Sequence, residues 1–505
     1  MLLPPGRAFV ESCELPPAPG LLARVETLRG RPYPWLLDSS LPSARLGRWS
    51  FAGADPYAVL RVRGERCELE CLRAVRRGLR VGRRSLRADP LELLRALAPP
   101  PPDAAPALAP PFVGGAVGYF GYELAARFEA LLLRAEDDLG LPDAILLFVD
   151  RVLAHDHASG ASFALGLGFG DDLASAKTNA AQAASELTRA SEASKRSAQR
   201  GEAERSTGGA GRSRAGTRWS GGARPPARRD PIDRAGYTKA IERAREEIAA
   251  GNLYQACLTR RLERDFSGDA WALHLALRRR NPAPFACFFE LPEAAIVGSS
   301  PERFLAVDAE GRVESRPIKG TRRRGGDPAL DARERRALLA SAKDRAENLM
   351  IVDLVRNDLG RVCELGSVEV PELMAVEDYA TVFHLVSTVR GRLRRGCDAL
   401  DALRAAFPPG SMTGAPKLAA IRLLDQLEPV RRGVYSGAIG YLDARGGADL
   451  AVVIRTVVLA GARAYLHTGG GIVADSEPHA EWLETLVKAR PLLDALEETD
   501  RPGGG

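Results

Sequence analysis

The sequence predicts an α+β fold, because predicted strands and predicted helices occur in separate groups along the chain. Strand patterns dominate before residue 173 and return at 253–319 and 435–467, whereas the longest helix patterns lie at 329–359 and 478–496. A strict βαβ alternation, which would indicate a doubly wound parallel sheet, does not occur in this order. With 505 residues the chain can form one large core or two to three domains.

The N-terminal region, residues 1–173, is predicted to consist mainly of strands. Residues 48–72 alternate apolar and polar side chains as paired strands do, and residues 112–124 combine aromatic residues with glycines, where we expect backbones to approach closely. The segment 174–230 is instead rich in Ala, Ser, Gly and Arg and has almost no large apolar residue. It cannot bury enough surface to offset its ordering entropy, so we predict a largely disordered linker or insertion, with helix only in its Ala-rich first half.

The longer C-terminal region, residues 231–496, begins with a helix pattern. Tyr237, Ile241, Ala244 and Ile248 lie on one helical face, and Gly251 is a suitable C-terminal stop. Residues 497–505 are expected to form a disordered tail. The remaining expected elements are strands at 253–262, 284–291, 295–300, 304–307 and 312–319, helices from about 329 to 359, strands at 435–442, 451–459 and 464–467, and a final helix near 478–496.

Charge and cysteine content limit the class of protein. The net charge is +6, but residues 171–230 hold 12 Lys and Arg against 7 Asp and Glu and so account for +5 of it. The basic character therefore belongs to the linker and argues against nucleic acid as a partner, although a nucleic-acid or scaffold role for the linker remains an alternative. Seven scattered cysteines provide neither a zinc site nor a disulfide framework. They predict a reducing cytoplasm, and the chain lacks both a signal peptide pattern and a membrane span.

Charged residues on two predicted helices have spacings that place them on one face. Glu481, Glu484 and Lys488 are at i, i+3 and i+7, and Asp344 and Glu347 repeat the i, i+3 spacing. Surface helices carry such charges routinely. Two carboxylate faces that converge from different helices would, however, suit Mg²⁺, which takes one or two protein carboxylates and leaves positions for water and an anionic substrate.

Several features are suited to binding an anion. Gly469, Gly470 and Gly471 follow a predicted strand and offer unblocked amides to a carboxylate. Arg455 stands among apolar strand residues, where its guanidinium needs a fixed carboxylate partner. The segment 408–417, PPGSMTGAPK, departs from the GxxxxGK[ST] pattern, so we reject nucleotide binding, although such a turn can bind an anion at a helix N-terminus.

Eight ordered motifs lie between residues 237 and 493: SSPERF, RPIKGT, ENLMIVDLVRNDLGRVC, HLVSTV, GSMTGAPK, YSGAIGYLD, VIRT and GGGIVADSEPHAEWLETLVKA. Their order resembles that of the chorismate-utilising enzymes, namely anthranilate synthase component I, aminodeoxychorismate synthase component I, and the isochorismate and salicylate synthases. The stretches PWLLDSS, GRWSFAGADP and FVGGAVGYFGYEL resemble the N-terminal region of the two amino-transferring members. The resemblance implies an α/β sandwich of two packed β-sheets with helices outside.

The resemblance also implies roles for individual residues. Glu347 and Glu484 would bind Mg²⁺, with Glu481 and Asp344 supporting it through water. Other residues would bind the two carboxylates of chorismate: Tyr435 and Arg455 the enolpyruvyl carboxylate, and Ser411, Gly470, Gly471 and Lys488 the ring carboxylate. His384 resembles the histidine placed near the reacting ring.

Lys319, in RPIKGT, is the residue that distinguishes the two amino-transferring members. Anthranilate synthases usually read PIAGT here and aminodeoxychorismate synthases PIKGT, whereas an arbitrary lysine is most simply explained as part of a solvated loop. The resemblance implies that the Lys319 amine attacks C2 of chorismate while Glu302 protonates the departing C4 hydroxyl. Ammonia then enters at C4 and expels the lysine, giving 4-amino-4-deoxychorismate for 4-aminobenzoate and folate synthesis. Glu302 should therefore have a raised pKa in a shielded site, and an anthranilate synthase that carries this lysine remains the alternative.

Two further expectations concern the nucleophile and its source. Gln255 stands where isochorismate and salicylate synthases carry a lysine that activates water, so water is not the expected nucleophile. No glutaminase pattern with a nucleophilic Cys is found in the sequence. The resemblance therefore implies a separate glutamine amidotransferase subunit that delivers ammonia.

Overall fold

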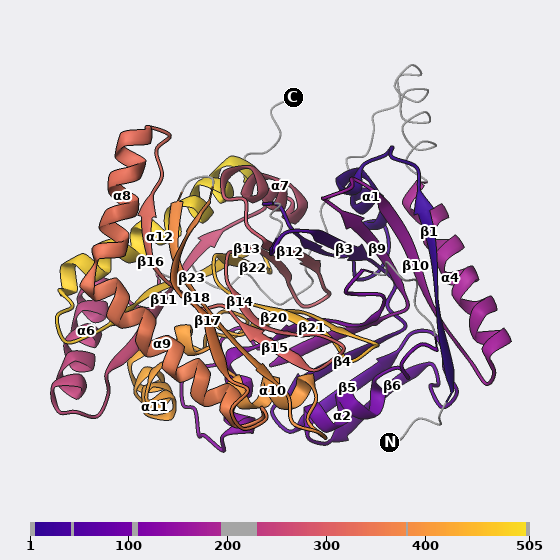
Figure 1. The fold of residues 1–505 in the computed structure, drawn as a ribbon, viewed down its shortest axis with the longest axis horizontal. Helices are drawn as coiled ribbons and strands as arrows, with labels where there is room; N and C mark the ends of the chain where they lie inside the picture. The colour runs from indigo at the N-terminus through magenta and orange to yellow at the C-terminus, as the bar shows by residue number, and fades with distance from the viewer. Residues whose placement is uncertain (1–5, 42–44, 104–109, 193–229, 380–381, 501–505) are drawn as a thin grey trace.

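Two large β-sheets form the centre of the molecule, and helices cover their outer faces (Figure 1). This arrangement is that of a computed structural model, which describes residues 6–41, 45–103, 110–192, 230–379 and 382–500. Both the predicted α+β class and the sandwich implied by the resemblance are confirmed. No helix in these described ranges is long and apolar enough to cross a membrane.

The first sheet has eleven strands and is built by both regions of the chain. Antiparallel pairing of Leu36 with Phe288 joins the N-terminal and C-terminal halves of the sheet. Its strands run in the order β1 (Arg7–Leu15), β10 (Ser162–Gly170), β9 (Arg151–Asp156), β3 (Trp49–Gly53), β2 (Trp35–Asp38), β12 (Phe285–Glu290), β13 (Ala295–Ser300), β22 (Thr456–Ala460), β23 (Arg463–Ile472), β11 (Gln255–Asp265) and β19 (Gly414–Ala415).

The second sheet is likewise shared between the two regions. Its order is β16 (Ile318–Arg323), β18 (Val382–Arg392), β15 (Arg312–Ser315), β14 (Arg303–Val307), β21 (Ala448–Val452), β20 (Ala438–Asp443), β7 (Gly115–Phe120), β8 (Ala144–Val149), β4 (Ala58–Arg63), β5 (Arg66–Cys71) and β6 (Gly82–Arg87), with β17 (Glu369–Asp378) paired to β18. At the junction, Gly118 lies opposite Gly440. A Cβ atom on Gly118 would lie 1.9 Å from the carbonyl oxygen of Ile145, so the close backbone approach expected for residues 112–124 is confirmed.

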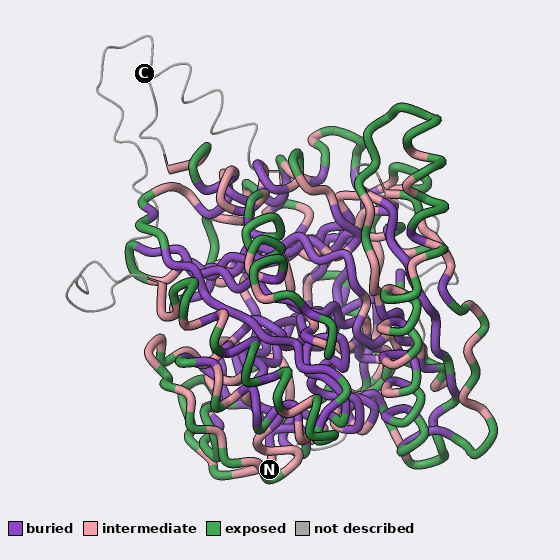
Figure 2. Tube along the Cα trace, turned by 90° about the vertical axis from the view of Figure 1, so that its left-hand side faces the viewer, coloured by how far each residue is buried: buried purple, intermediate pink, exposed green. Residues whose placement is uncertain are grey.

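An apolar core fills the space between the sheets. It contains Trp35 and Phe51 from the first sheet and Val59, Leu146 and Tyr441 from the second. Figure 2 shows the buried residues concentrated in the centre of the molecule, with exposed residues on the surrounding helices and loops. Since the residues of this core come from both regions of the chain, residues 1–173 and 231–496 fold around one interior.

The helices form the outer layers. Contacts with the first sheet are made by α1 (Leu21–Leu28), α4 (Leu173–Glu192), α6 (Arg234–Ala249), α7 (Ala270–Arg280), α11 (Lys417–Leu427) and α12 (Pro478–Thr499). Contacts with the second sheet are made by α8 (Pro328–Ala340) and α9 (Ala342–Gly360), and α10 (Ala399–Ala406) packs on α9. The shorter elements are α2 (Pro90–Leu97), α3 (Ala125–Phe128) and the 3₁₀ turns η1 (Tyr122–Leu124) and η2 (Gly410–Met412).

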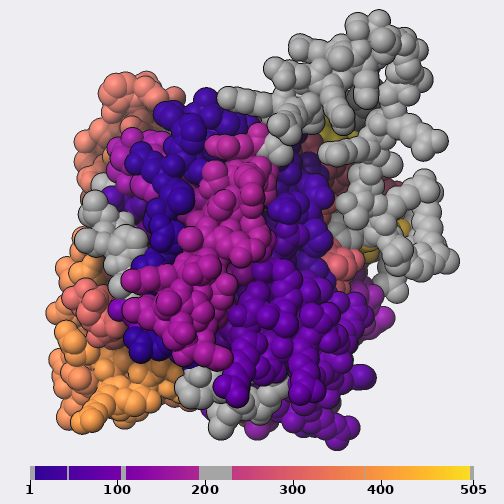
Figure 3. Space-filling model, turned by 90° about the vertical axis from the view of Figure 1, so that its right-hand side faces the viewer, coloured from indigo at the N-terminus to yellow at the C-terminus, as the bar shows by residue number. Residues whose placement is uncertain are grey.

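Helix α4 corrects the predicted start of the linker. Its residues Ala180 and Leu187 are buried, and the helix lies on the surface beside the N-terminal strand (Figure 3). A Cβ atom on Gly168 of β10 would lie 2.1 Å from the backbone nitrogen of Ala180, so the glycines of the strand let the alanines of the helix pack closely. The first part of 174–230 is therefore an ordered helix, as its Ala-rich composition allowed, and residues 193–229 lie outside the described ranges.

The predicted C-terminal tail also begins too early. Helix α12 continues to Thr499, and the carboxylate of Asp500 accepts a hydrogen bond of 2.6 Å from the backbone nitrogen of Ser267. Residues 501–505 lie outside the described ranges.

Two predicted strands are divided. The predicted strand 312–319 consists of β15 and β16, and the break includes Pro317, which has no N–H to donate. The predicted strand 451–459 consists of β21 and β22, separated where Arg455 has a positive φ of 49°. Both breaks lie beside predicted site residues, because Lys319 follows the first and Arg455 is part of the second.

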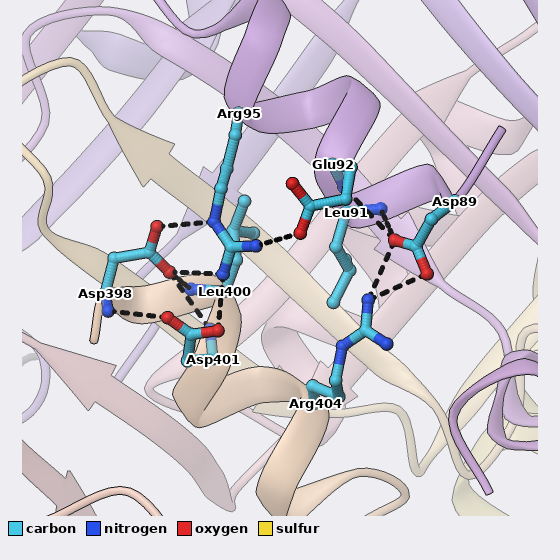
Figure 4. Close-up of polar contacts among 8 residues, drawn as sticks. All are labelled: Asp89, Leu91, Glu92, Arg95, Asp398, Leu400, Asp401 and Arg404. Carbon is cyan, nitrogen blue, oxygen red and sulfur yellow. Dashed lines mark hydrogen bonds and ion pairs between the residues drawn. The ribbon is translucent and has the colours of Figure 1, made fainter. Parts of the chain in front are cut away.

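Helices α2 and α10 join the two regions of the chain at the surface through reciprocal ion pairs (Figure 4). Asp89 caps the N-terminus of α2 and accepts from Arg404 of α10 at 2.8 Å through both oxygens. Asp398 caps α10 and accepts from Arg95 of α2 at 2.8 and 3.0 Å. Each arginine thus reaches the N-cap of the other helix.

Candidate active site

Lys319 and Glu302 lie at the turn that carries Ser411. The Lys319 amine in β16 donates to the carbonyl oxygen of Ser411 at 3.3 Å. Glu302 stands between β13 and β14 and is 5% exposed. Burial raises the pKa of Glu302 to about 7, although the Ser411 hydroxyl and the Lys319 charge act to lower it. The expectation of a raised pKa in a shielded site is confirmed, and a carboxyl in this state can donate a proton near neutral pH.

The carboxylates of α9 and α12 converge on Lys343. Its amine lies 3.9 Å from Glu347 Oε1 and 3.8 Å from Glu481 Oε1. Burial raises the pKa of both carboxyls, and the negative charge of Glu484 raises them further. The Glu484 side chain is partly exposed on α12; desolvation acts to raise its pKa, but Lys488 at 2.7 Å outweighs that effect and lowers it.

Asp344 does not join these carboxylates directly. It lies in the first turn of α9, where the Ser341 hydroxyl caps the helix, and its Oδ2 accepts from Arg322 Nη2 at 2.8 Å. Within the described ranges, no three His, Cys, Asp or Glu side chains gather closely enough to hold a metal ion. The four carboxylates therefore do not form one direct ligand cluster, and the roles expected of Glu347 and Glu484 as ligands and of Glu481 and Asp344 through water stay a prediction.

The remaining donor set nevertheless fits Mg²⁺. This ion needs only one or two protein carboxylates and completes its shell with water and ligand oxygens. Burial and the negative charge of Glu484 both raise the pKa of Glu347 and Glu481. A bound cation would offset both effects, because it stabilises ionised carboxylates. We therefore treat Glu347, Glu481 and Glu484 as residues that can hold the ion.

Gly469, Gly470 and Gly471 were expected to follow a strand, but they form part of β23 and pair with β11, and Gly470 faces the same carboxylates. A Cβ atom on Gly470 would lie 3.0 Å from Glu481 Oε2 and 3.5 Å from Glu484 Oε1, and Lys488 donates to the carbonyl oxygen of Gly469 at 2.9 Å. The neighbouring Gly471 lies against Gln255, because a Cβ atom there would be 2.0 Å from the Gln255 amide nitrogen.

The Gln255 side chain is fully buried and is oriented by this packing. Neither its amide nitrogen nor its amide oxygen has a hydrogen-bond partner. Buried polar groups are rarely left unpaired, so this amide is available to a ligand that reaches Gln255 beside Gly471.

Arg455 is held by an amide instead of the predicted carboxylate. Its Nη1 donates to Asn281 Oδ1 at 3.1 Å, and no Asp or Glu of the described residues lies within ion-pair distance. Burial lowers the pKa of the guanidinium. Among the described residues no protein carboxylate supplies the expected partner, and the guanidinium keeps donors free for the carboxylate of an anionic ligand.

His384 and Tyr435 are two further predicted site residues, and the charge of Arg455 acts on His384. Burial and then the Arg455 charge lower the pKa of His384 to about 3, so its imidazole is neutral. The Thr321 hydroxyl lies 2.9 Å from its Nδ1. The Tyr435 ring stacks on His467 with centroids 4.9 Å apart. A neutral imidazole therefore lies near Arg455, and Tyr435 is fixed in a buried aromatic pair.

Two residues of the site were not singled out from the sequence. Asn281, which follows α7, carries no local signal for its contact with Arg455. Lys343 had a usable signal, since it precedes Glu347 by one helical turn. Lys417 of GSMTGAPK is buried and pairs with Asp358 of α9 at 2.7 Å, in agreement with the rejection of a nucleotide-binding loop.

A cavity of about 410 Å³ lies elsewhere between the sheets. It is lined by Asp38, Trp49, Phe51, Phe285 and Tyr441, among others, and by none of the predicted site residues. The candidate active site is therefore defined by its converging polar groups and not by the size of a cavity.

Comparisons with known proteins agree with this arrangement. The family model described as chorismate binding enzyme matches residues 41–494. A Streptomyces griseus protein named aminodeoxychorismate synthase is 42% identical over 497 residues, covering 93% of this chain but only 62% of that protein. Anthranilate synthase component 1 of Streptomyces coelicolor is 42% identical (92% and 84% covered), and aminodeoxychorismate synthase component 1 of Klebsiella aerogenes is 39% identical (93% and 95% covered). The solved structure of anthranilate synthase component I from Streptococcus pneumoniae has a TM-score of 0.68 and 29% identity, covering 90% of this chain and 93% of that one. The chain belongs to the chorismate binding enzyme family.

Proposed function

We propose that this chain is the component that converts chorismate and ammonia to 4-amino-4-deoxychorismate. The observation that carries the proposal is the position of Lys319. Its amine contacts the Ser411 carbonyl, and its charge acts on Glu302, Glu347 and Glu484. An amine at the centre of the predicted site can act as a nucleophile. The relatives named aminodeoxychorismate synthase support this assignment.

The proposed reaction consists of two displacements. The Lys319 nitrogen bonds to C2, the ring double bonds shift, and the C4–O bond breaks as Glu302 gives its proton to the departing hydroxyl, which leaves as water. Ammonia then bonds to C4, the double bonds shift back, and the C2–N bond breaks to release the lysine. The net change replaces the C4 hydroxyl with an amino group and releases one water. Two reversals of the double bonds explain why the amino group enters at C4.

The other residues bind and orient the substrate in this proposal. Arg455 and Tyr435 would hold the enolpyruvyl carboxylate, and Lys488 with the amides of Gly470 and Gly471 would surround the ring carboxylate. Mg²⁺ held by the carboxylates of α9 and α12 would neutralise that ring carboxylate when bound. The neutral His384 would lie beside the ring without adding charge.

A glutamine amidotransferase subunit is proposed as the source of ammonia. The chain spans 62% of the length of the Streptomyces griseus relative, and other relatives carry the name component 1. Both facts support a second functional unit that works with this chain. The product would serve 4-aminobenzoate and folate synthesis.

One alternative function has specific support. The Streptomyces coelicolor anthranilate synthase component 1 is as similar to this chain as the first aminodeoxychorismate synthase, at 42% identity. In that alternative, ammonia would enter at C2 and the product would be anthranilate. Product identity therefore separates the two.

Replacement of the lysine tests the proposal. Lys319→Ala should lose most aminodeoxychorismate formation from chorismate and ammonium while still binding chorismate and Mg²⁺. Lys239→Ala, on the exposed face of α6, is the matched control and should keep the wild-type rate. Wild-type turnover in Lys319→Ala, measured after conversion of the product to 4-aminobenzoate by a lyase, would contradict the covalent role.

A further inference from the structure

Arg432 is a buried arginine whose five N–H groups all have acceptors. It lies between α11 and β20 and is 3% exposed. Its Nε and Nη2 donate to Glu428 at 2.7 and 2.6 Å. Its Nη1 donates to the Met412 carbonyl at 2.7 Å and to the Ser436 hydroxyl at 3.3 Å, and Nη2 also donates to the Cys257 carbonyl at 2.7 Å. The full donor capacity of a guanidinium is thus used in a fixed geometry.

The partner carboxylate is fixed as firmly. Glu428 follows α11, is 7% exposed, and accepts from the backbone nitrogen and hydroxyl of Thr259 at 2.8 and 3.0 Å. The Tyr122 ring lies 4.5 Å from the Arg432 guanidinium carbon. The backbone nitrogen of Arg432 donates to Glu123 at 2.8 Å. The pair is therefore held from several elements at once.

Arg432 contacts three segments, and each of them carries a residue of the candidate site. Met412 follows Ser411, whose carbonyl accepts from Lys319. Cys257 lies two residues after Gln255 in β11, and Ser436 follows Tyr435. These segments are distant in sequence, so their relative placement depends on contacts such as those of this guanidinium.

We propose that Arg432 and Glu428 are positioning residues that fix these three segments around one bound substrate. This inference rests on the proposed function. A buried ion pair is a weak source of net stability, because desolvation offsets its attraction. Its directed hydrogen bonds instead set geometry, and a misplacement of about 1 Å at an active site can lower a rate by about 100-fold. Neither residue touches the reacting atoms.

Glu428→Gln is the main test, because it keeps the shape of the side chain and replaces one acceptor oxygen with a donor. The matched control is Asp150→Asn, which alters a buried carboxylate paired with Arg73 at 2.5 Å in the N-terminal region. Full-length variants would be compared by thermal unfolding, by kcat and KM with ammonium as the amine source, and by amide hydrogen exchange without ligand.

We expect Glu428→Gln to lower kcat by about 10-fold or more, with an unchanged KM for ammonium. Amide exchange should increase at 255–259, 410–415 and 432–437. Asp150→Asn should lower the melting temperature and keep the wild-type kcat. The proposal is overturned if Glu428→Gln keeps the wild-type kcat, or if both variants lose kcat in proportion to stability.

Two further measurements separate a folding failure of Glu428→Gln and a failure of the proposed function from a failure of the positioning role. If Glu428→Gln does not fold, Ser436→Ala removes a single acceptor of Arg432 and should still lower kcat at an unchanged melting temperature; an unchanged kcat overturns the positioning role. If wild-type protein leaves chorismate unconverted, the proposed function fails and the role in catalysis fails with it. Normal wild-type turnover with an unaffected Glu428→Gln variant overturns the positioning role alone.

Discussion

Glu302→Gln should change the pH dependence of stability in a direction set by the burial of this carboxyl. The pKa of Glu302 is about 7 in the folded chain, against an ordinary value of 4.5. A raised carboxyl pKa means that the folded state keeps the proton while the unfolded state releases it. The contribution of Glu302 to stability is therefore fully present below pH 4.5 and is lost as pH rises to about 7.

The size of the effect follows from the two pKa values. A tenfold change in an equilibrium constant corresponds to about 1.4 kcal/mol, so ionised Glu302 costs the folded state about 3 kcal/mol above pH 7. Glutamine has nearly the same shape and does not titrate. Relative to wild type, Glu302→Gln should therefore gain about 3 kcal/mol between pH 4 and pH 8.5 while losing turnover.

Urea unfolding at pH 4 and pH 8.5 measures this difference. The control is Glu314→Gln, because burial of Glu314 is outweighed by Arg303 and Arg390, which lower its pKa. Glu314 stabilises the fold above its ordinary pKa, so this control should lose stability at pH 8.5. An equal effect of Glu302→Gln at both pH values would refute the reasoning that burial keeps Glu302 protonated.

Three other perturbations test separate parts of the account. Glu484→Ala should raise the Mg²⁺ concentration needed for chorismate binding, and an unaltered metal dependence in titrations would remove it from the ligand set. Gly470→Ala would place a methyl group 3.0 Å from Glu481 Oε2 and should weaken chorismate binding measured by calorimetry, whereas wild-type affinity would contradict the packing. Replacement of residues 193–229 by a flexible linker should leave turnover and melting temperature unchanged, while removal of 174–230 deletes most of α4 and should lower the melting temperature. Equal melting temperatures for the two deletions would contradict the packing of α4.

The sequence predicts the architecture well, because hydrophobic periodicity reports burial directly. Helix α6 and strands β12, β13 and β14 lie close to their predicted bounds. The sequence did not predict the full length of α4, because its buried face consists mainly of alanines. Such a face packs closely only when glycines lie opposite, as those of β10 do here. That partner is distant in sequence and leaves no local signal.

In the candidate site, too, the sequence predicts which residues share one helix face but not which distant residues they contact. The spacing of Glu481 and Glu484 predicted their shared face, and the raised pKa of Glu302 was expected from its role. The orientation of Asp344 toward Arg322 and the contact of Arg455 with Asn281 depend on tertiary packing. Spacing along a helix cannot resolve such pairings.

Identification of the product tests the central claim most directly. Purified protein would be incubated with chorismate, Mg²⁺ and ammonium at mildly alkaline pH, and the products separated by chromatography, with a lyase added to a parallel sample. The account predicts 4-amino-4-deoxychorismate, which the lyase converts to 4-aminobenzoate. Fluorescent anthranilate as the product would contradict the assignment of amination to C4 and the role of Lys319.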